Sequence, residues 1–209
     1  MRRTPLPLAA PLAAVLLATP AAALFIDAAS DPALVGAVVH DLDNQPDGLR
    51  FQRAVVDGVL TISTSSGELL FDDAWTANFG TTGISLQTRY LTGGDDFRID
   101  FATPVRAFGM NVNALDIDWT LETYDTAGNL LGSYRIRRQL PPGSNRRRGY
   151  AGAVEAGPIA SARIHGAGRH DWALVDNIAV VAVPEPRSLL LMGLGTLGLA
   201  VAGRRRDAA

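Results

Sequence analysis

The 209-residue chain contains no cysteine, and its 19 basic residues are all arginines because lysine is absent as well. Without cysteine, the chain has no disulfide cross-links, thiol catalysis or thiolate metal sites. The missing lysine reflects a compositional bias of the source rather than a functional choice. Aromatic residues make up only 7% of the chain. We therefore expect Trp75, Trp119, Trp172 and Tyr150 to serve packing first, although each could also stack on a sugar ring.

Recognisable catalytic motifs are missing too. No serine lies in a nucleophile elbow, no His-Glu-x-x-His motif occurs, and Gly93-Gly94 precedes two aspartates whose charges would repel a phosphate. The nearest approach to a catalytic set is His165, His170 and Asp171, which could supply a base, an orienting group or metal ligands. We assign no catalytic residue and expect a protein that is not an enzyme. A secreted glycan hydrolase is the alternative.

The N-terminus has the order of a secretory signal. Arg2 and Arg3 follow the initial methionine, and residues 6–19 form an apolar stretch interrupted by prolines. Ala21 and Ala23 then form an A-x-A cleavage site. This order predicts a signal peptide over residues 1–23. The chain should therefore pass through the secretory translocon and be cut by signal peptidase.

The C-terminus carries an uncharged apolar run at residues 189–203, followed by Arg204, Arg205 and Arg206. At about 1.5 Å per residue, a helix over this run falls slightly short of the roughly 30 Å hydrocarbon core of a bilayer. Snorkelling arginines could make up the difference, and the positive-inside rule puts the arginine cluster in the cytoplasm and the preceding domain outside. We expect a marginal transmembrane helix; a buried core helix is the alternative.

Just before this run, Pro184 and Pro186 flank Glu185 and disfavour a helix, so the motif should be extended and accessible. Taken together, residues 183–209 resemble the PEP-CTERM sorting signal of exported proteins in Gram-negative bacteria that make exopolysaccharide. The resemblance implies recognition by an exosortase, a membrane-embedded cysteine protease that cuts near the Pro-Glu-Pro. It also implies a protein that is transiently anchored in the membrane and then resides at the cell surface or outside the cell.

Between the two ends, residues 24–182 have the length of one domain with its own core. This body has 13 arginines against 19 acidic residues, a net charge of −6. An acidic body gives nucleic-acid binding little electrostatic support.

Short runs of alternating apolar and polar residues, separated by glycine, proline and aspartate turns, predict strands throughout the body and no long amphipathic helix. Asp57-Gly58 should join two strands as a tight hairpin, and a turn at Thr103-Pro104 should separate two more. The apolar residues of 96–101 should face the core. The predicted strands are 49–56, 59–64, 84–91, 96–101, 105–112, 119–125, 130–137, 161–165 and 173–181. This pattern predicts an all-β fold, a single antiparallel β-sandwich.

The segments 101–109, 122–125, 128–132 and 173–178 resemble the jelly-roll ectodomains that often accompany this sorting signal, and they are similar in outline to carbohydrate-binding jelly rolls. The resemblance implies a jelly-roll-like sandwich and, less directly, a polysaccharide ligand. The expected function is therefore that of an exported, sorted surface or extracellular-matrix protein. It would bind exopolysaccharide or be a structural component of the matrix.

Two acidic features predict calcium ligands. Asp41, Asp43 and Asp47 are spaced along one loop so that carboxylate oxygens could converge on Ca²⁺, although the loop lacks the glycine and the final acidic residue of an EF-hand. Asp176 lies in the last apolar strand, where a carboxylate is costly unless it is hydrogen-bonded or metal-bound. By resemblance, many sugar-binding jelly rolls hold a structural calcium through an acidic residue near the final strand. A solvated turn and an outward-facing aspartate are the alternatives.

Arg146, Arg147 and Arg148, followed by Tyr150, form a basic patch on an otherwise acidic body. Guanidinium groups suit carboxylates and phosphates, so these residues are candidate contacts for an anionic polysaccharide or a lipid headgroup. A solvated loop is the alternative.

Overall fold

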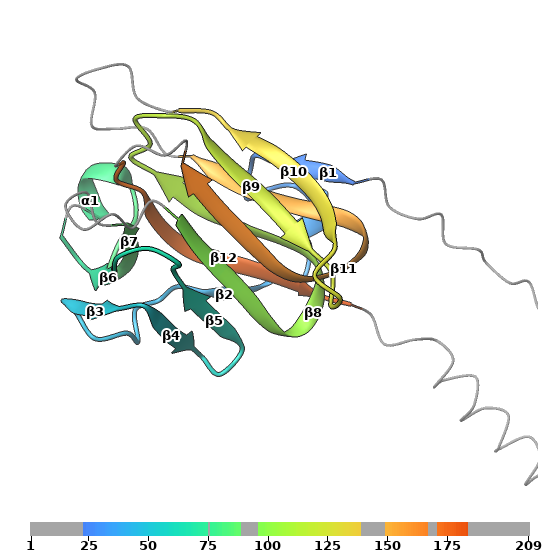
Figure 1. Ribbon diagram of the computed structural model, residues 1–209. Coiled ribbons are helices and arrows are strands. Elements are labelled where there is room, and N and C mark those ends of the chain that lie inside the picture. The colour runs from blue at the N-terminus through green and yellow to red at the C-terminus, as the bar shows by residue number, and fades with distance from the viewer. Residues whose placement is uncertain (1–22, 75, 89–95, 139–148, 167–170, 184–209) are drawn as a thin grey trace, which may run out of the picture.

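The computed structural model describes residues 23–74, 76–88, 96–138, 149–166 and 171–183, and Figure 1 shows their arrangement. The expected signal-peptide core, the arginines of the basic patch and everything after Val183 lie outside these residues. The strands are β1 Leu24–Ile26, β2 Val38–His40, β3 Leu49–Phe51, β4 Arg53–Val56, β5 Leu60–Ser63, β6 Leu69–Asp72, β7 Ser85–Thr88, β8 Asp96–Asn113, β9 Trp119–Tyr124, β10 Leu130–Ile136, β11 Tyr150–Gly166 and β12 Leu174–Ala182. The described helices are the 3₁₀ turn η1 (Pro32–Leu34) and the short α1 (Thr76–Phe79).

Two layers of antiparallel strands pack face to face (Figure 1). The front layer has the order β4-β5-β8-β11-β9-β10, to which β8 contributes residues 96–101 and β11 contributes residues 161–166. The back layer has the order β1-β11-β8-β12. It continues with β2 and β7, which share one edge of β12, and then with β6 and β3. The antiparallel all-β sandwich confirms the predicted fold class.

β8 and β11 belong to both layers because each is one long strand that bends between them. Hydrogen bonding is therefore continuous, and the layers form one 12-stranded sheet folded on itself. The predicted turn at Thr103-Pro104 is wrong, since β8 runs through both residues and only shifts its register against β11 there. Proline has no N–H to give to a ladder, so it is tolerated at such an irregularity without ending the strand.

The first half of β11 is a strand that the sequence pattern did not predict. It begins with Tyr150 and continues through the small residues Ala151, Gly152 and Ala153. A Cβ on Gly152 would collide with the backbone of Phe108, so glycine allows β11 to lie close against β8. Small residues contribute little to a hydrophobic period, which is why alternation did not reveal this strand.

The core lies between the layers. Phe97, Ile99 and Phe101 are buried in it, as the alternation predicted. The predicted hairpin is also confirmed, because β4 pairs with β5 and the connecting Asp57 and Gly58 have φ of 51° and 70°. Two consecutive residues with positive φ are what a type I′ turn requires, and its twist matches that of the flanking strands.

Both ends of the described chain lie at the same end of the sandwich (Figure 1). Leu24 of β1 pairs with Val154, and Ala182 of β12 pairs with Val105, close to the bends of β11 and β8. No helix among the described residues is long and apolar enough to cross a membrane, and the expected span at 189–203 lies outside them. The first and last strands of the described chain therefore reach the same end of the sandwich.

Candidate functional site

A buried carboxylate marks the outward face of the back layer. Asp176 of β12 is only 1% exposed, while its neighbour Val175 faces the core. β12 has an irregularity between Asp176 and Ala179, where Asn177 takes a φ of 51°. Asn177 donates to Asp176 from its backbone nitrogen at 2.6 Å and from its side-chain amide at 2.9 Å. These bonds orient the carboxylate but bring no positive charge to it.

The loop after β2 brings two more carboxylates toward Asp176. Leu42 is buried and has a left-handed φ of 65°, and around it the Asp43 backbone nitrogen donates to Asp41 Oδ1 at 3.2 Å. Asp43 Oδ1 also accepts from the Ile84 backbone nitrogen at 2.8 Å. Gly83 makes room for this contact, because any Cβ there would overlap the Asp43 carboxylate. We call Asp41, Asp43 and Asp176 the acidic cluster.

The acidic cluster is electrostatically strained. Burial raises the pKa of Asp176 to about 7; the hydrogen bond from the Asn177 backbone opposes the rise, and the charges of Asp43 and Asp41 add to it. A cation among these groups would relieve their repulsion, and carboxylate oxygens are ligands that Ca²⁺ prefers. Asp41 and Asp43 thus lie near enough to Asp176 for their charges to act on it, but the oxygens of the three carboxylates do not all lie within 4.8 Å of one another. Calcium binding itself stays a prediction.

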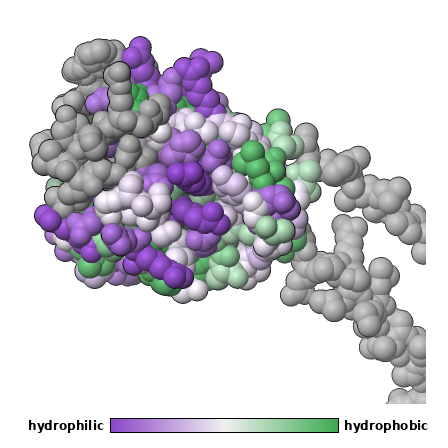
Figure 2. Space-filling model, viewed as in Figure 1, coloured by the Kyte–Doolittle hydropathy of each residue, from purple (hydrophilic) through white to green (hydrophobic). Residues whose placement is uncertain are grey.

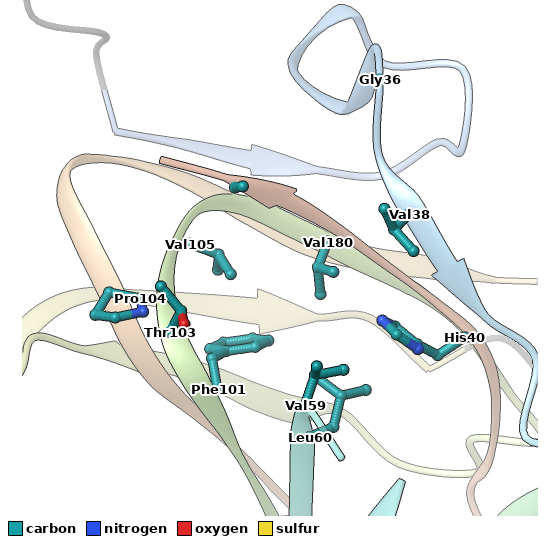
Figure 3. A pocket seen from close by; sticks show the side chains of 11 residues that line it. Gly36, Val38, His40, Val59, Leu60, Phe101, Thr103, Pro104, Val105 and Val180 are labelled. Atoms are coloured by element: carbon teal, nitrogen blue, oxygen red, sulfur yellow. The ribbon is translucent and has the colours of Figure 1, made fainter. Parts of the chain in front are cut away.

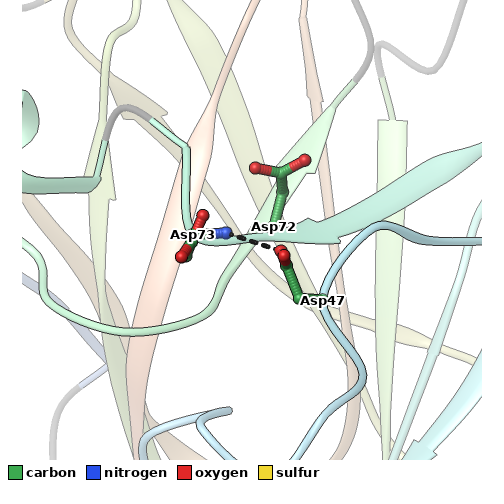
Figure 4. Close-up of side chains that lie close together, drawn as sticks. All are labelled: Asp47, Asp72 and Asp73. Atoms are coloured by element: carbon green, nitrogen blue, oxygen red, sulfur yellow. Dashed lines mark hydrogen bonds between the residues drawn. The ribbon is translucent and has the colours of Figure 1, made fainter.

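Asp47, the fourth predicted ligand, lies in a different cluster (Figure 4). It meets Asp72 and Asp73 at the end of β6, where one oxygen of each carboxylate lies within 4.8 Å of the others. Asp47 Oδ1 accepts from the Asp73 backbone nitrogen at 3.2 Å. All three side chains are at least partly exposed, so water and salt screen their repulsion. The predicted ligand set is therefore divided between two places.

Beside the acidic cluster, the outward face of the back layer has a groove of about 390 Å³, which we call the tyrosine groove. Tyr150, Asn111 and Asn177 supply its polar side-chain atoms. Asn111 pairs with Asp176 across β8 and β12, so the groove and the acidic cluster adjoin. The other lining residues are Ala29, Leu34, Gly36, Ala37, Val39 and Ala179. Concave sites of this size, with a few polar groups among apolar walls, are where small ligands usually bind.

Tyr150 is held firmly at the start of β11. The preceding Gly149 donates to Asn113 Oδ1 at 2.7 Å, and the Tyr150 ring fills the space that a Cβ on Gly109 would need. Burial raises the pKa of the Tyr150 phenol to about 12, and the charge of Asp31 adds to the rise. The hydroxyl therefore stays protonated and can donate a hydrogen bond at neutral pH. Tyr150 is half-buried, so it combines a fixed ring with access to solvent.

The outward face of the front layer is polar, and Figure 2 shows hydrophilic side chains gathered in the middle of this face. Arg98 donates to Asp100 at 2.7 Å and to Ser161 at 2.6 Å. On the neighbouring strand, Arg163 lies 3.5 Å from Asp96. Because these charges pair with one another, Arg98 with Asp100 along β8 and Arg163 with Asp96 across β11 and β8, the face presents balanced charge rather than a patch of one sign.

Two of the large aromatics serve packing. Trp119 is 1% exposed, and its indole Nε1 donates to Asp171 at 2.7 Å. Trp172 packs edge-on against Phe79 of α1, with ring centroids 5.7 Å apart. Of the aromatics considered as sugar contacts, Tyr150 lines a groove on a sheet face.

Asp171 and His165, which were considered for catalysis, make different contacts in the structure. Asp171 is 2% exposed and accepts hydrogen bonds from Trp119 and from the backbone of Asp116 and Ile117. It therefore ties down the loop before β9. His165 lies on the front face with its Nε2 3.6 Å from Glu122, and His170 lies outside the described residues.

The described residues thus form an antiparallel β-sandwich with an acidic cluster and an adjoining groove on one outward face. Residues 182–206 match the family model of the PEP-CTERM protein-sorting motif, which confirms the resemblance of the C-terminal segment. The motif implies export and a membrane-anchored sorting step. The search of curated proteins found no match.

Several solved structures are similar to this chain at low sequence identity. A DUF4465 family protein from Bacteroides caccae is 11% identical with a TM-score of 0.47, and the match covers 71% of this chain and 100% of that protein. The K2 cleaved adhesin domain of Lys-gingipain is 10% identical with a TM-score of 0.46, covering 71% and 99%. A family 29 carbohydrate-binding module is 7% identical with a TM-score of 0.34, covering 76% and 90%.

Proposed function

We propose that the chain is an exosortase-sorted surface or extracellular-matrix protein whose β-sandwich binds polysaccharide without cleaving it. The tyrosine groove is the observation that carries this proposal. Tyr150 offers a ring face for a sugar, Asn111 and Asn177 offer amides for its hydroxyls, and small residues such as Ala179 leave space between them. All four residues stand on β8, β11 and β12, which lie next to one another in the sheet.

In this proposal the acidic cluster supports the groove. Asn177 bonds to Asp176 and also lines the groove. A Ca²⁺ that drew the carboxylates of Asp41, Asp43 and Asp176 together would fix the Asp176 carboxylate, and through it the Asn177 amide that meets the ligand. Calcium would therefore act as a structural ion rather than as a catalytic one.

Because of the arginines in the basic patch, we propose that the bound polysaccharide is anionic. Arg146, Arg147 and Arg148 precede Tyr150 by two to four residues in the chain. Guanidinium groups pair well with carboxylate and phosphate substituents. Such contacts would make binding weaken as salt is raised.

Cleavage of a glycan commonly needs two carboxyl groups facing the scissile bond. No acidic side chain is among the described residues that line the tyrosine groove. The groove can therefore hold sugar units through amide, hydroxyl and ring contacts without supplying the acid and base of a hydrolase.

Calorimetric titration of the full chain in lipid nanodiscs with the exopolysaccharide of the source organism tests the proposal. Asn111→Ala should weaken binding by roughly fivefold to tenfold, the effect of losing one or two hydrogen bonds. Tyr150→Phe keeps the ring and should weaken binding less. Tyr124→Phe, a half-buried tyrosine on the front layer, is the matched control and should bind like the wild type.

If no binding heat is measured either with or without Ca²⁺, the proposal is refuted. Reducing sugar released from the polysaccharide over time would favour a hydrolase instead. If Asn111→Ala leaves the affinity for the polysaccharide unchanged, the binding site lies outside the tyrosine groove.

A further inference from the structure

A second cavity, which we call the edge pocket, opens between the two layers at the edge of the sandwich (Figure 3). Its volume is about 270 Å³. The floor is made by buried residues of β5 and β8, including Phe101 and Val105, and β12 contributes Val180. The mouth is formed by Val38 and Val59, which are 62% and 42% exposed. The pocket is therefore accessible from solvent and mostly apolar inside, with His40 and the exposed Thr103 as the polar side chains that line it.

One polar ring reaches into this apolar space. His40 of β2 lines the edge pocket, and its Nδ1 lies 2.6 Å from Asp57 Oδ2 in the β4–β5 hairpin turn. A carboxylate can only accept, so Nδ1 carries the hydrogen and donates it to Asp57. When the ring carries no charge, Nε2 is an acceptor, and it has no protein partner among the described residues. Figure 3 shows the imidazole extending toward the space between Val180 and Leu60.

The edge pocket and the tyrosine groove lie on opposite sides of one short strand. Val38 and His40 of β2 line the pocket, whereas Val39 between them lines the groove, as expected when successive side chains of a strand point to opposite faces. Gly36, which has no side chain, borders both cavities. A ligand with units linked in a chain could therefore cross the backbone at Gly36, just before β2, and occupy both.

We propose that the edge pocket binds a 6-deoxy sugar unit of the polysaccharide, with the methyl group among the apolar walls and a ring hydroxyl donating to His40 Nε2. The proposal rests on the glycan binding proposed above and adds the chemical class of one sugar. An ordinary hexose would place its C6 hydroxyl against Val105, Val180 and Phe101, whose side chains have no atom that can form a hydrogen bond. Burying an unpaired hydroxyl is costly, whereas burying a methyl group is favourable.

The test compares methyl α-L-fucopyranoside with methyl α-L-galactopyranoside, which differ only in the C6 hydroxyl. Both are titrated into the full chain in lipid nanodiscs by calorimetry. We expect the fucoside to bind roughly 10- to 100-fold more tightly, the range that corresponds to one buried unpaired hydroxyl. Binding should also shift the ¹⁵N resonance of His40 Nε2, a measurement on the wild-type protein that needs no variant.

Two substitutions on β2 form a matched pair. Val38→Phe puts a ring at the mouth of the edge pocket and should abolish the preference for the fucoside. Val39→Phe adds the same ring on the opposite face and should keep the preference. Equal affinities for the two glycosides, an unmoved His40 resonance on fucoside binding, or a preference that survives Val38→Phe would overturn the proposal.

Titration with the intact exopolysaccharide separates this proposal from the function on which it rests. If the polysaccharide binds through Asn111 but the glycosides are not discriminated, the edge-pocket proposal fails and glycan binding stands. If neither the polysaccharide nor the glycosides bind, both proposals fail.

Discussion

Replacing Asp176 by asparagine should stabilise the calcium-free protein near neutral pH. Asparagine keeps the size of the side chain and an oxygen that can accept from the Asn177 backbone, but it removes the carboxyl charge. Burial, with the charges of Asp43 and Asp41, raises the pKa of Asp176 from 3.8 to about 7. Between these values the native state keeps the proton and the unfolded chain has lost it, so stability falls as the pH rises through this window.

The magnitude follows from the two pKa values. Each pKa unit corresponds to about 1.4 kcal/mol, so the charged Asp176 carboxylate costs the native state on the order of 4 kcal/mol above about pH 7. Below about pH 4 the wild type and Asp176→Asn should have similar free energies of unfolding. Saturating Ca²⁺ should stabilise the wild type alone, by about 3 kcal/mol at a hundredfold excess over Kd.

Urea unfolding of the full chain, followed by tryptophan fluorescence at about pH 5 and about pH 8 with Ca²⁺ or with a chelator, measures both effects. Asp47→Asn is the matched control because Asp47 belongs to the exposed cluster with Asp72 and Asp73. It should change neither the pH dependence nor the response to Ca²⁺. Parallel pH curves for the wild type and Asp176→Asn would refute the burial argument. Stabilisation by Ca²⁺ that is lost in Asp47→Asn but kept in Asp176→Asn would place the ion in the other cluster.

Three further predictions concern other parts of the chain. Trp119→Phe removes a donor from the buried Asp171 carboxylate, so it should lower the free energy of unfolding in urea by roughly 1–3 kcal/mol; an unchanged midpoint would refute this role. Burial tends to raise the pKa of Asp96, but hydrogen bonds from three hydroxyl groups and a nearby arginine outweigh it and lower the pKa. The Asp96 carboxylate therefore stabilises the native state at pH values above its pKa in the unfolded chain, and this stabilisation is lost as the pH falls through its lower pKa in the folded protein. Asp96→Asn should therefore reduce the loss of thermal stability below about pH 4, as measured by thermal melts. Replacing Glu185 and Pro186 by alanine should leave the precursor in the inner membrane, as judged by fractionation and gel mobility; normal release of that variant would contradict the sorting assignment.

The tail and the strand pattern were readable from local sequence. The PEP-CTERM motif is a short contiguous signal, and no folding is needed to recognise its order. The Asp57-Gly58 hairpin was also predictable, because two positive φ values within a tight turn strongly favour such residues. The strand over residues 150–160 was not, since its small residues carry no clear period, and the run through Thr103-Pro104 was misread because proline is a turn signal as often as a mark of an irregular strand.

The candidate site needed the tertiary structure. Spacing alone grouped Asp41, Asp43 and Asp47, but the left-handed conformation of Leu42 and the contact with Ile84 separate the first two from the third. Asn111 carried no signal in the sequence, and it lines the tyrosine groove only because β8 pairs with β12. His40 likewise gained a role only when β2 was placed beside the β4–β5 hairpin.

The sequence by itself indicated export with a membrane-anchored sorting step and the all-β class, because the sorting motif and alternating hydrophobicity are local properties of the chain. The tertiary structure decided which side chains meet. Pairings such as Asp176 with Asn111 join residues far apart in the chain, and they depend on strand register and on an irregularity in β12. Register and backbone irregularities are set by packing of the whole sandwich, so the acidic cluster, the tyrosine groove and the edge pocket became visible only in the folded chain.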